Sequence, residues 1–159
     1  MNLQHDHKNI TVLELDITRE IDINAIRDFV ASAWGNIDAI IHNAGKLIHK
    51  PFFKTIMTDF MEVYKVNVFA VAELIKLLLP FVNRGGHIIG VGSMGGVQGS
   101  KKYPGLSAYT SSKGALITLF ELLAEEYHES GIAFNTLAIG AVQTEMLKRA
   151  FPGYKASIS

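Results

Sequence analysis

Segments with the spacing of short buried strands alternate along this chain with longer segments that have the spacing of amphipathic helices. The strand-like segments are residues 10–15, 37–41, 86–92 and 132–138, and the helix-like segments are residues 22–35, 58–79 and 107–129. Strands that alternate with helices of this length are typical of βαβ units, whose strands run parallel. The pattern therefore predicts an α/β fold with a doubly wound parallel sheet.

The expected helix boundaries follow from residues that start or stop a helix. Asp22 and Thr58 have side-chain oxygens that can accept hydrogen bonds from the free N–H groups of a first helical turn. Gly35 and Gly131 follow the last apolar residues of their segments, and Pro80 cannot continue a helix. We therefore expect helices that begin at Asp22 and Thr58 and stop at or near these glycines and the proline.

Composition narrows the class of protein. The 159 residues are 48% hydrophobic, which suits one globular domain spanning residues 1–159. Lys plus Arg and Asp plus Glu both number 15, so the chain has no net charge and no basic stretch of the kind that binds nucleic acid. The chain has no cysteine, which excludes disulfides and thiolate chemistry within it.

The sequence also leads to expectations about membranes, location and metals. Polar residues, charged residues and a proline interrupt the most apolar stretch, residues 66–82, so we expect no membrane-spanning helix. The first seven residues lack the charged and apolar regions of a signal peptide, and we expect a cytoplasmic protein. His5 and His7 lack a suitably spaced third ligand, so we expect no metal site.

Polar or small residues stand where the expected strands end. Asp16, Asn43, Ser93 and Gly140 each lie at or just beyond the end of a strand-like segment. In open parallel sheets, ligands bind beyond the carboxyl ends of the strands. We therefore expect a ligand site at this edge of the sheet.

Tyr109 and Lys113 lie one helical turn apart on the expected helix 107–129. A positive charge beside a phenol favours the phenolate and lowers its pKa from about 10, and a general acid or base works best with a pKa near the operating pH. Such a spacing arises by chance in roughly a third of chains of this composition. A solvated helix face is therefore an alternative to a proton-transfer pair.

Two further polar residues are candidates for the same site. Ser93 ends a buried strand and precedes Gly95 and Gly96, which let a ligand approach the backbone; it either orients a substrate oxygen or simply begins a turn. Asn67 lies in an apolar helical run, where an amide without hydrogen-bond partners costs about 1–3 kcal/mol. Asn67 either satisfies a local backbone group or takes part in a polar relay.

Taken in order, Asn67, Ser93, Tyr109 and Lys113 match the tetrad of the short-chain dehydrogenase/reductase family, which the chain resembles from about residue 10 to residue 146. Further matches are Asp16 at the end of the family's third strand, Asn43-Ala44-Gly45 after its fourth strand, and Gly140 and Thr144 after its sixth strand. The resemblance implies a Rossmann-like fold that is incomplete here.

The resemblance also implies a role for each residue. Tyr109 is the expected acid/base for a carbonyl or alcohol, Lys113 lowers its pKa and holds the nicotinamide ribose, Ser93 orients the substrate oxygen, and Asn67 supports a water-mediated proton relay. The implied cofactor is NAD or NADP, with the preference open. Its expected contacts are Asp16, Ile17, Asn43, Ala44, Gly45, Tyr109, Lys113, Gly140 and Thr144.

The family pattern is not matched throughout. Family members begin with a strand and a Gly-rich turn that holds the pyrophosphate at a helix N-terminus, whereas the resemblance here starts just before the third strand. Residues 90–95 match G-x-G-x-x-G, but they straddle a strand end, continue into a loop and have no acid about 20 residues later, so we do not assign them this role. The family's substrate lid is cut short as well.

The unmatched strands raise a question about the sheet. In the order 3-2-1-4-5-6, the first and second strands separate the third from the fourth. At about 4.8 Å per strand, their absence leaves a gap of roughly 10 Å. Residues 10–15 then either pair elsewhere, stay loose or border strands that another polypeptide supplies.

Two functional hypotheses follow. The first is an NAD(P)-dependent oxidoreductase that moves hydride between nicotinamide and a small carbonyl or alcohol substrate. The second is a catalytically silent relative that acts as an oligomerisation or interaction module. The resemblance further implies a homodimer or homotetramer formed through helices 58–79 and 107–129, with no nucleic-acid or membrane partner.

Overall fold

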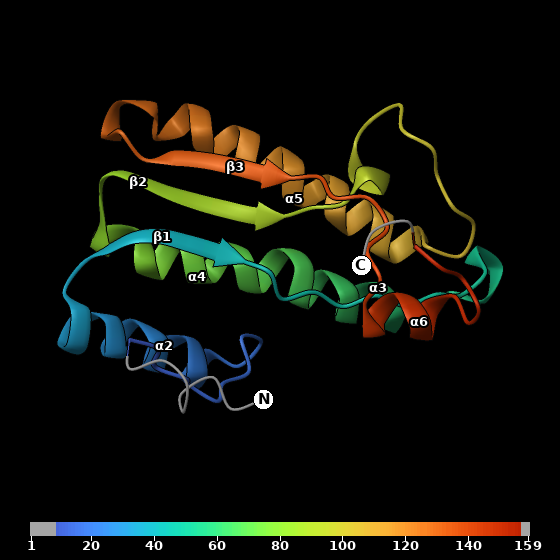
Figure 1. Ribbon diagram of the computed structural model, residues 1–159, viewed down its shortest axis with the longest axis horizontal. Helices are drawn as coiled ribbons and strands as arrows, with labels where there is room; N and C mark the ends of the chain where they lie inside the picture. The colour runs from blue at the N-terminus through green and yellow to red at the C-terminus, as the bar shows by residue number, and fades with distance from the viewer. Residues whose placement is uncertain (1–8, 157–159) are drawn as a thin grey trace.

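The computed structural model describes residues 9–156. These residues form a three-stranded parallel sheet in the order β1-β2-β3, with β1 at Ile37–His42, β2 at Val82–Val91 and β3 at Ala133–Leu137 (Figure 1). The predicted α/β class, Rossmann-like and incomplete, is confirmed. Three of the four expected strands are present, and β2 begins at Val82 rather than at Gly86.

The strand register brings the ends of the three strands to one edge. His42 pairs with Gly90, and Gly90 pairs on its other side with Thr136. Because all three strands run in the same direction, the loops that follow them leave the sheet side by side. This edge is where the sequence predicted a ligand site.

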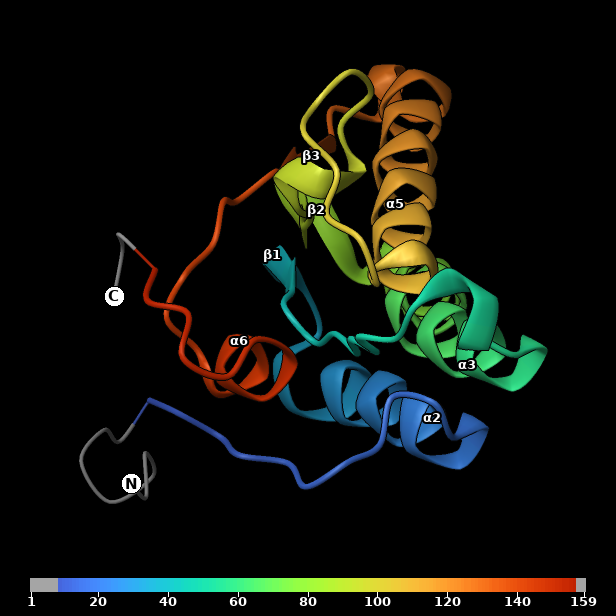
Figure 2. The ribbon, with the colours of Figure 1, turned by 90° about the vertical axis from the view of Figure 1, so that its right-hand side faces the viewer.

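Helices flank the sheet (Figure 2). The α-helices are α2 (Glu20–Phe29), α3 (Met57–Tyr64), α4 (Ala70–Leu78), α5 (Ser107–Glu126) and α6 (Glu145–Ala150). Two π-helical segments extend or join them, η1 (Val30–Trp34) after α2 and η3 (Lys65–Phe69) between α3 and α4. Short 3₁₀ turns are η2 (Phe52–Lys54), η4 (Leu79–Phe81), η5 (Met94–Gly96) and η6 (His128–Ser130).

The core lies between the sheet and the helices α4 and α5. Its buried members come from both helices and from β2 and β3: Val71, Ile75, Ile88, Leu116, Phe120 and Phe134. A second cluster holds α2 against β1 and α4, and consists of Ile23, Val30, Ile37, Leu74 and Leu78. Since burial of apolar area contributes about 25 cal/mol per Å², these two clusters fix the positions of the helices.

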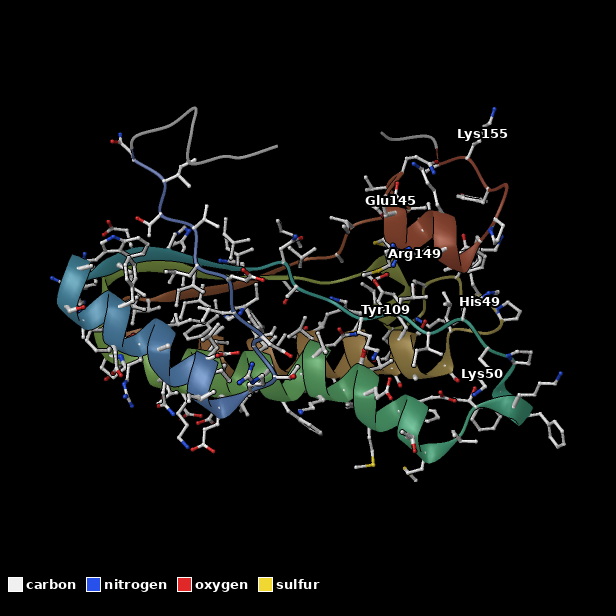
Figure 3. All side chains as sticks on the ribbon, turned by 90° about the horizontal axis from the view of Figure 1, so that it is seen from below. His49, Lys50, Tyr109, Glu145, Arg149 and Lys155 are labelled. Carbon is white, nitrogen blue, oxygen red and sulfur yellow. The ribbon has the colours of Figure 1, made fainter. Side chains whose placement is uncertain are left out.

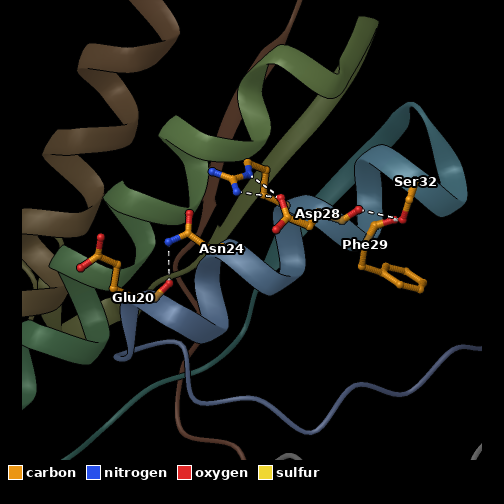
Figure 4. A network of polar contacts seen from close by, with 6 residues as sticks. Glu20, Asn24, Asp28, Phe29 and Ser32 are labelled. Atoms are coloured by element: carbon orange, nitrogen blue, oxygen red, sulfur yellow. Dashed lines mark hydrogen bonds and ion pairs between the residues drawn. The ribbon is translucent and has the colours of Figure 1, made fainter.

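Local polar contacts stabilise the outer side of α2 (Figure 4). Asn24 Nδ2 donates to Glu20 O at 3.0 Å, and Ser32 Oγ donates to Asp28 O at 2.8 Å. Arg27 pairs with the Asp28 carboxylate at 2.7 Å. Exposed ion pairs contribute little to stability, so the apolar cluster rather than these contacts sets the position of the helix.

The predicted helix ends are confirmed more often than the predicted starts. Gly35 and Gly131 both have a φ of 74° and directly follow helical segments. The predicted caps are wrong: Arg19 and Ile56 occupy the N-cap positions, and neither caps with its side chain. Asp22 lies inside the first turn of α2, where its carboxylate accepts from the N–H of Asp16 at 3.0 Å.

The strand expected at residues 10–15 is absent. These residues have no regular secondary structure, and Ile10, Val12 and Leu13 are exposed. An extended segment is stable as a strand only when a neighbour completes its backbone hydrogen bonds, and within residues 9–156 no strand borders β1 on the side away from β2. Of the three possibilities left by the sequence, pairing elsewhere in the sheet is excluded for the described chain.

Between residues 9 and 156, no helix combines the length and the apolar character needed to cross a membrane.

Candidate active site

Lys113 lies on α5 with only 4% of its surface exposed. Its Nζ donates to Val91 O, at the end of β2, at 2.6 Å. An ammonium has three N–H donors, so this bond uses one of them. Burial lowers the pKa of Lys113, because the charged form loses its hydration. The side chain is therefore anchored beneath the predicted ligand site with donors to spare.

Tyr109 lies one turn before Lys113 and is partly buried. The Lys113 Nζ is 5.9 Å from the centre of the Tyr109 ring. Burial raises the pKa of the Tyr109 phenol, and hydrogen bonding with the Ser93 side chain opposes this shift. The expectation that Lys113 lowers the pKa of Tyr109 is not met in this structure, because the ammonium is directed to Val91 O and desolvation of the phenol dominates.

Ser93 reaches Tyr109 because the turn η5 packs tightly against α5. The Ser93 Oγ accepts from the N–H of Gly95 at 3.2 Å and caps this turn. A Cβ atom on Gly96 would lie 2.7 Å from the carbonyl carbon of Lys113, closer than real Cβ contacts come. Gly96 is therefore required for this approach, which brings Ser93 beside the helix that contains Tyr109 and Lys113.

Lys102 holds the loop after Ser93, and the sequence analysis missed it. Its Nζ donates to Gly95 O and Val97 O, both at 2.6 Å, and to Ser100 Oγ at 2.9 Å. The ammonium thus joins three groups of one loop. Two adjacent lysines in a loop look solvated in the sequence, so no pattern there indicates this contact.

Asn67 is fully buried in η3, and its side chain holds the loop that follows β1. Its Oδ1 accepts from the N–H of Lys46 at 2.7 Å, and its Nδ2 donates to Lys46 O at 2.9 Å. The second Nδ2 hydrogen bond, at 2.9 Å, goes to Ser112 Oγ, which itself donates to Tyr109 O at 2.7 Å. Both N–H donors of Asn67 are therefore used by the protein.

Ser112 is a second residue that the sequence analysis missed. It is fully buried and connects the Asn67 side chain to the backbone of Tyr109. The run Thr110-Ser111-Ser112 contains three similar hydroxyl residues, and helical position alone distinguishes the buried one. Its place on the inner face of α5 is the only signal that sequence reasoning could have used.

Gly45 lies where the Asn67 and Lys113 side chains meet. A Cβ on Gly45 would be 3.6 Å from both Asn67 Oδ1 and Lys113 Nζ. Asn43 and Ala44, just before it, are exposed at the edge of the sheet. The structure thus gathers Asn43-Ala44-Gly45 with Asn67, Ser93, Tyr109 and Lys113, and the last four are called the tetrad below.

Gly140 and Thr144 follow β3 at the same edge. The N–H of Met94 donates to Ile139 O at 2.9 Å, which ties this segment to the turn after Ser93. Gly140 is exposed, and Thr144 Oγ1 accepts from the N–H of Leu147 at 3.2 Å and caps α6. Thr144 therefore has a structural task besides any contact with a ligand.

Asp16 and Ile17 lie in the segment before α2. The carboxylate of Asp16 accepts from the backbone N–H and the hydroxyl of Thr18, both at 2.8 Å, and these two bonds lower the pKa of Asp16. Its hydrogen bonds are thus local to this segment rather than made with the tetrad.

A pocket of about 390 Å³ lies beside Gly45, and Figure 3 labels two of its lining residues, His49 and Arg149. Its lining comes from the loop after β1 and from α6: Gly45, Lys46, Leu47, His49, Met146, Arg149 and Ala150. Within residues 9–156, no three or more His, Asp or Glu side chains gather in a way that could hold a metal ion. His5 and His7 lie outside the described residues.

Comparison with known proteins agrees with this arrangement. The family model for short chain dehydrogenase matches residues 1–155. The 7alpha-hydroxysteroid dehydrogenase of Escherichia coli is 36% identical over 135 residues, which are 84% of this chain and 51% of that protein. A diacetyl reductase [(S)-acetoin forming] of Staphylococcus aureus is 34% identical over 137 residues, 84% of this chain and 52% of that protein.

Solved structures show the same relationship. A short-chain dehydrogenase from Salmonella enterica serovar Typhi superposes with a TM-score of 0.85 at 27% identity, covering 96% of this chain and 65% of the other. The chain belongs to the short-chain dehydrogenase/reductase family, a family of oxidoreductases. It spans about half the length of the relatives that it matches in sequence.

Proposed function

We propose that this chain contains the reaction centre of an NAD(P)-dependent oxidoreductase that interconverts a carbonyl and an alcohol. The observation that supports this most is the buried Lys113 ammonium, held by one carbonyl one turn from Tyr109. Burying an ammonium is costly, and perturbed titratable groups gather at functional sites. A solvated helix face, the alternative for this pair, does not agree with the burial of Lys113.

Each member of the tetrad has a part in this proposal. Tyr109 gives a proton to the carbonyl oxygen in reduction and takes it back in oxidation. Ser93 holds the same oxygen by a hydrogen bond, since its hydroxyl lies beside the phenol. Asn67 acts by positioning, because its amide fixes the loop at Lys46 and, through Ser112, the backbone of Tyr109. We retain a water-mediated relay through Asn67 only as part of this proposal.

The residues present fit the nicotinamide end of the cofactor, which supplies or accepts the hydride when bound. Gly45 leaves open the space next to Lys113 Nζ, whose unused donors suit ribose hydroxyls. Asn43, Ala44, Gly140 and Thr144 lie at the same edge. In the part of the chain that the structure describes, no Gly-rich turn opens a helix to hold the pyrophosphate. We therefore propose that tight cofactor binding needs polypeptide in addition to residues 9–156.

The remaining proposals concern the setting of the protein. We propose a single domain over residues 1–159, a cytoplasmic location, and a homodimer or homotetramer formed through the helices at 58–79 and 107–129. The choice between NAD and NADP stays open. The alternative of a catalytically silent interaction module has no support in the comparisons.

The test combines cofactor binding and turnover. NADH and NADPH are titrated into the chain by fluorescence, and reduction of a panel of aldehydes and ketones is followed by absorbance. We expect Tyr109→Phe to lower turnover about 100-fold or more, since general acid–base catalysis contributes about 10²–10⁴-fold. Tyr103→Phe, an exposed tyrosine six residues earlier, is the control. Full activity of Tyr109→Phe would refute the assignment, and no binding up to millimolar cofactor would refute independent activity of this chain.

A further inference from the structure

The loop that joins Ser93 to α5 has little regular structure of its own. It spans residues 94–106, and the turn η5 is its only helical segment. In Figure 1 this loop, in yellow, extends away from the sheet before it returns to the start of α5. Loops of this length that stay ordered within a domain are usually functional. The contacts that hold this one therefore bear on how Ser93 is presented.

The ammonium of Lys102 is the centre of those contacts. Its Nζ donates to Gly95 O and Val97 O, both at 2.6 Å, and to Ser100 Oγ at 2.9 Å. An ammonium has three N–H donors, so the loop accepts all of them. Ser100 Oγ is itself hydrogen-bonded to Val97 O at 2.8 Å and to Met94 O. One cation thus ties together the turn after Ser93 and the residues that follow it.

The surroundings of Lys102 differ from those of other lysines in the chain. Lys46, Lys50 and Lys148 each pair with a carboxylate at 2.7–2.8 Å. No Asp or Glu between residues 9 and 156 pairs with Lys102, and its acceptors are uncharged oxygens of its own loop. Its neighbour Lys101 is directed elsewhere, with its Nζ 5.4 Å from the centre of the Tyr103 ring. The two adjacent lysines therefore have separate contacts.

Gly95 connects Lys102 to Ser93. The carbonyl of Gly95 accepts from Lys102 Nζ, and the N–H of Gly95 donates to Ser93 Oγ at 3.2 Å. A serine hydroxyl has one donor and two acceptor positions, so this N–H occupies an acceptor position and leaves the hydroxyl hydrogen free. That hydroxyl also lies within hydrogen-bonding reach of the Tyr109 phenol. Lys102 touches neither Ser93 nor Tyr109, and any effect on them passes through Gly95.

We propose that Lys102 is a positioning residue for the reaction: its ammonium fixes Gly95, and Gly95 holds the Ser93 hydroxyl in the rotamer that faces the substrate oxygen. Without the ammonium, the carbonyls of Gly95 and Val97 lose their common partner, and the turn no longer holds Gly95 N–H against Ser93 Oγ. This inference rests on the proposed function, since Ser93 must be the group that holds the substrate oxygen.

The first test needs neither cofactor nor substrate. The χ1 rotamer of Ser93 is measured by three-bond NMR couplings in the full chain. We expect a single rotamer in the wild type and in the control Lys101→Met, and rotamer averaging in Lys102→Met, with faster hydrogen exchange at the Gly95 N–H. Lys102 is exposed and neither core cluster contains a residue of this loop, so Lys102→Met should remain folded, which circular dichroism verifies.

The second test is a double-mutant cycle on turnover of aldehydes and ketones. We expect Lys102→Met to lower kcat about fivefold, the equivalent of one hydrogen bond, with a smaller change in KM. In a Ser93→Ala background the same substitution should have no further effect, because residues that act through one group are not additive. Lys101→Met should leave kcat unchanged in both backgrounds.

The two proposals fail in different ways. A single Ser93 rotamer in Lys102→Met would overturn the positioning role whatever the turnover. Equal losses of kcat from Lys102→Met with and without Ser93 would also overturn it, because the lysine would then act by another route. Rotamer averaging in Lys102→Met, in a chain whose wild type shows no turnover, would leave the contact in place and count against the redox function instead.

Discussion

At the scale of single residues, Asn67 and His42 are both buried and polar but differ in what they contact. Asn67 has three hydrogen bonds to the protein. His42, 7% exposed, lies with its ring edge-on to Phe120, and no residue in the range 9–156 bonds its Nε2. Burial lowers the pKa of His42 from 6.5 to about 4, because the imidazolium would be desolvated without compensation.

This burial predicts a loss of stability in acid. In the unfolded chain, His42 becomes protonated as the pH falls below 6.5. In the folded chain it becomes protonated only near pH 4. The stability present above pH 6.5 is therefore lost as the pH falls to 4, by roughly 3 kcal/mol at most. Urea unfolding between pH 7 and pH 4 measures this change, and His42→Asn should remove most of it.

The quantity to compare between variants is how steeply the free energy of unfolding changes with pH. Its absolute value is not comparable, since a buried asparagine itself destabilises the fold. His87→Asn, at an exposed histidine on β2, is the matched control and should keep the wild-type slope. An unchanged slope in His42→Asn would show that the folded chain protonates His42 as easily as the unfolded chain does.

At the scale of elements, the position of Ser93 depends on how closely η5 approaches α5. Gly96 meets the backbone at Lys113 and Gly114, which cannot move without shifting the helix. Its neighbour Gly95 meets only the side chains of Thr110 and Ser93, at 3.4 Å or more. Two glycines of one turn therefore differ in what an added methyl group would do.

We predict that Gly96→Ala destabilises the fold by about 1–3 kcal/mol, the usual cost of overpacking, and moves Ser93 away from Tyr109. Gly95→Ala should cost less than about 1 kcal/mol. Thermal unfolding measures the loss of stability, and backbone chemical shifts at Ser93 and Tyr109 report the displacement of Ser93. Equal stabilities of the two variants would show that η5 can move off the helix without cost.

The same elements show how much of the fold can be predicted from the sequence. The periodicity of apolar residues located β1, β2, β3 and α5 correctly, because that period is set by burial in the final fold. The prediction of a strand at residues 10–15 was wrong, since a strand forms only beside a neighbouring strand and a local pattern does not reveal whether one is present. The order of the tetrad predicted a common site, but no spacing predicts that Ser112 bonds to Asn67 and Tyr109 or that Lys102 holds the loop after Ser93. The pKa of Tyr109 was mispredicted because burial of the phenol outweighs the opposing hydrogen bond with Ser93.

At the scale of the whole molecule, two of the surfaces that expose large apolar side chains bear on self-association. One is the sheet face opposite α4 and α5, where Ile41 and Leu137 are 64% and 52% exposed. The other is the outer face of the helices, where Met61, Phe69 and Leu122 are 59–63% exposed. Exposed apolar patches mark interaction surfaces, so either face could form the contact between copies, and substitutions on the two faces tell them apart.

The proposed oligomer uses the helical face, so a charge there should dissociate it. We predict that Phe69→Lys raises the dissociation constant between copies at least tenfold, and that Leu122→Lys acts in the same direction, because a lysine in an apolar interface must be desolvated. Ile41→Lys, an equally exposed position on the sheet face, is the matched control and should leave association unchanged. Sedimentation equilibrium over a range of protein concentrations measures all three, with circular dichroism to verify folding. Dissociation by Ile41→Lys but not by Phe69→Lys would instead place the contact between copies on the open sheet.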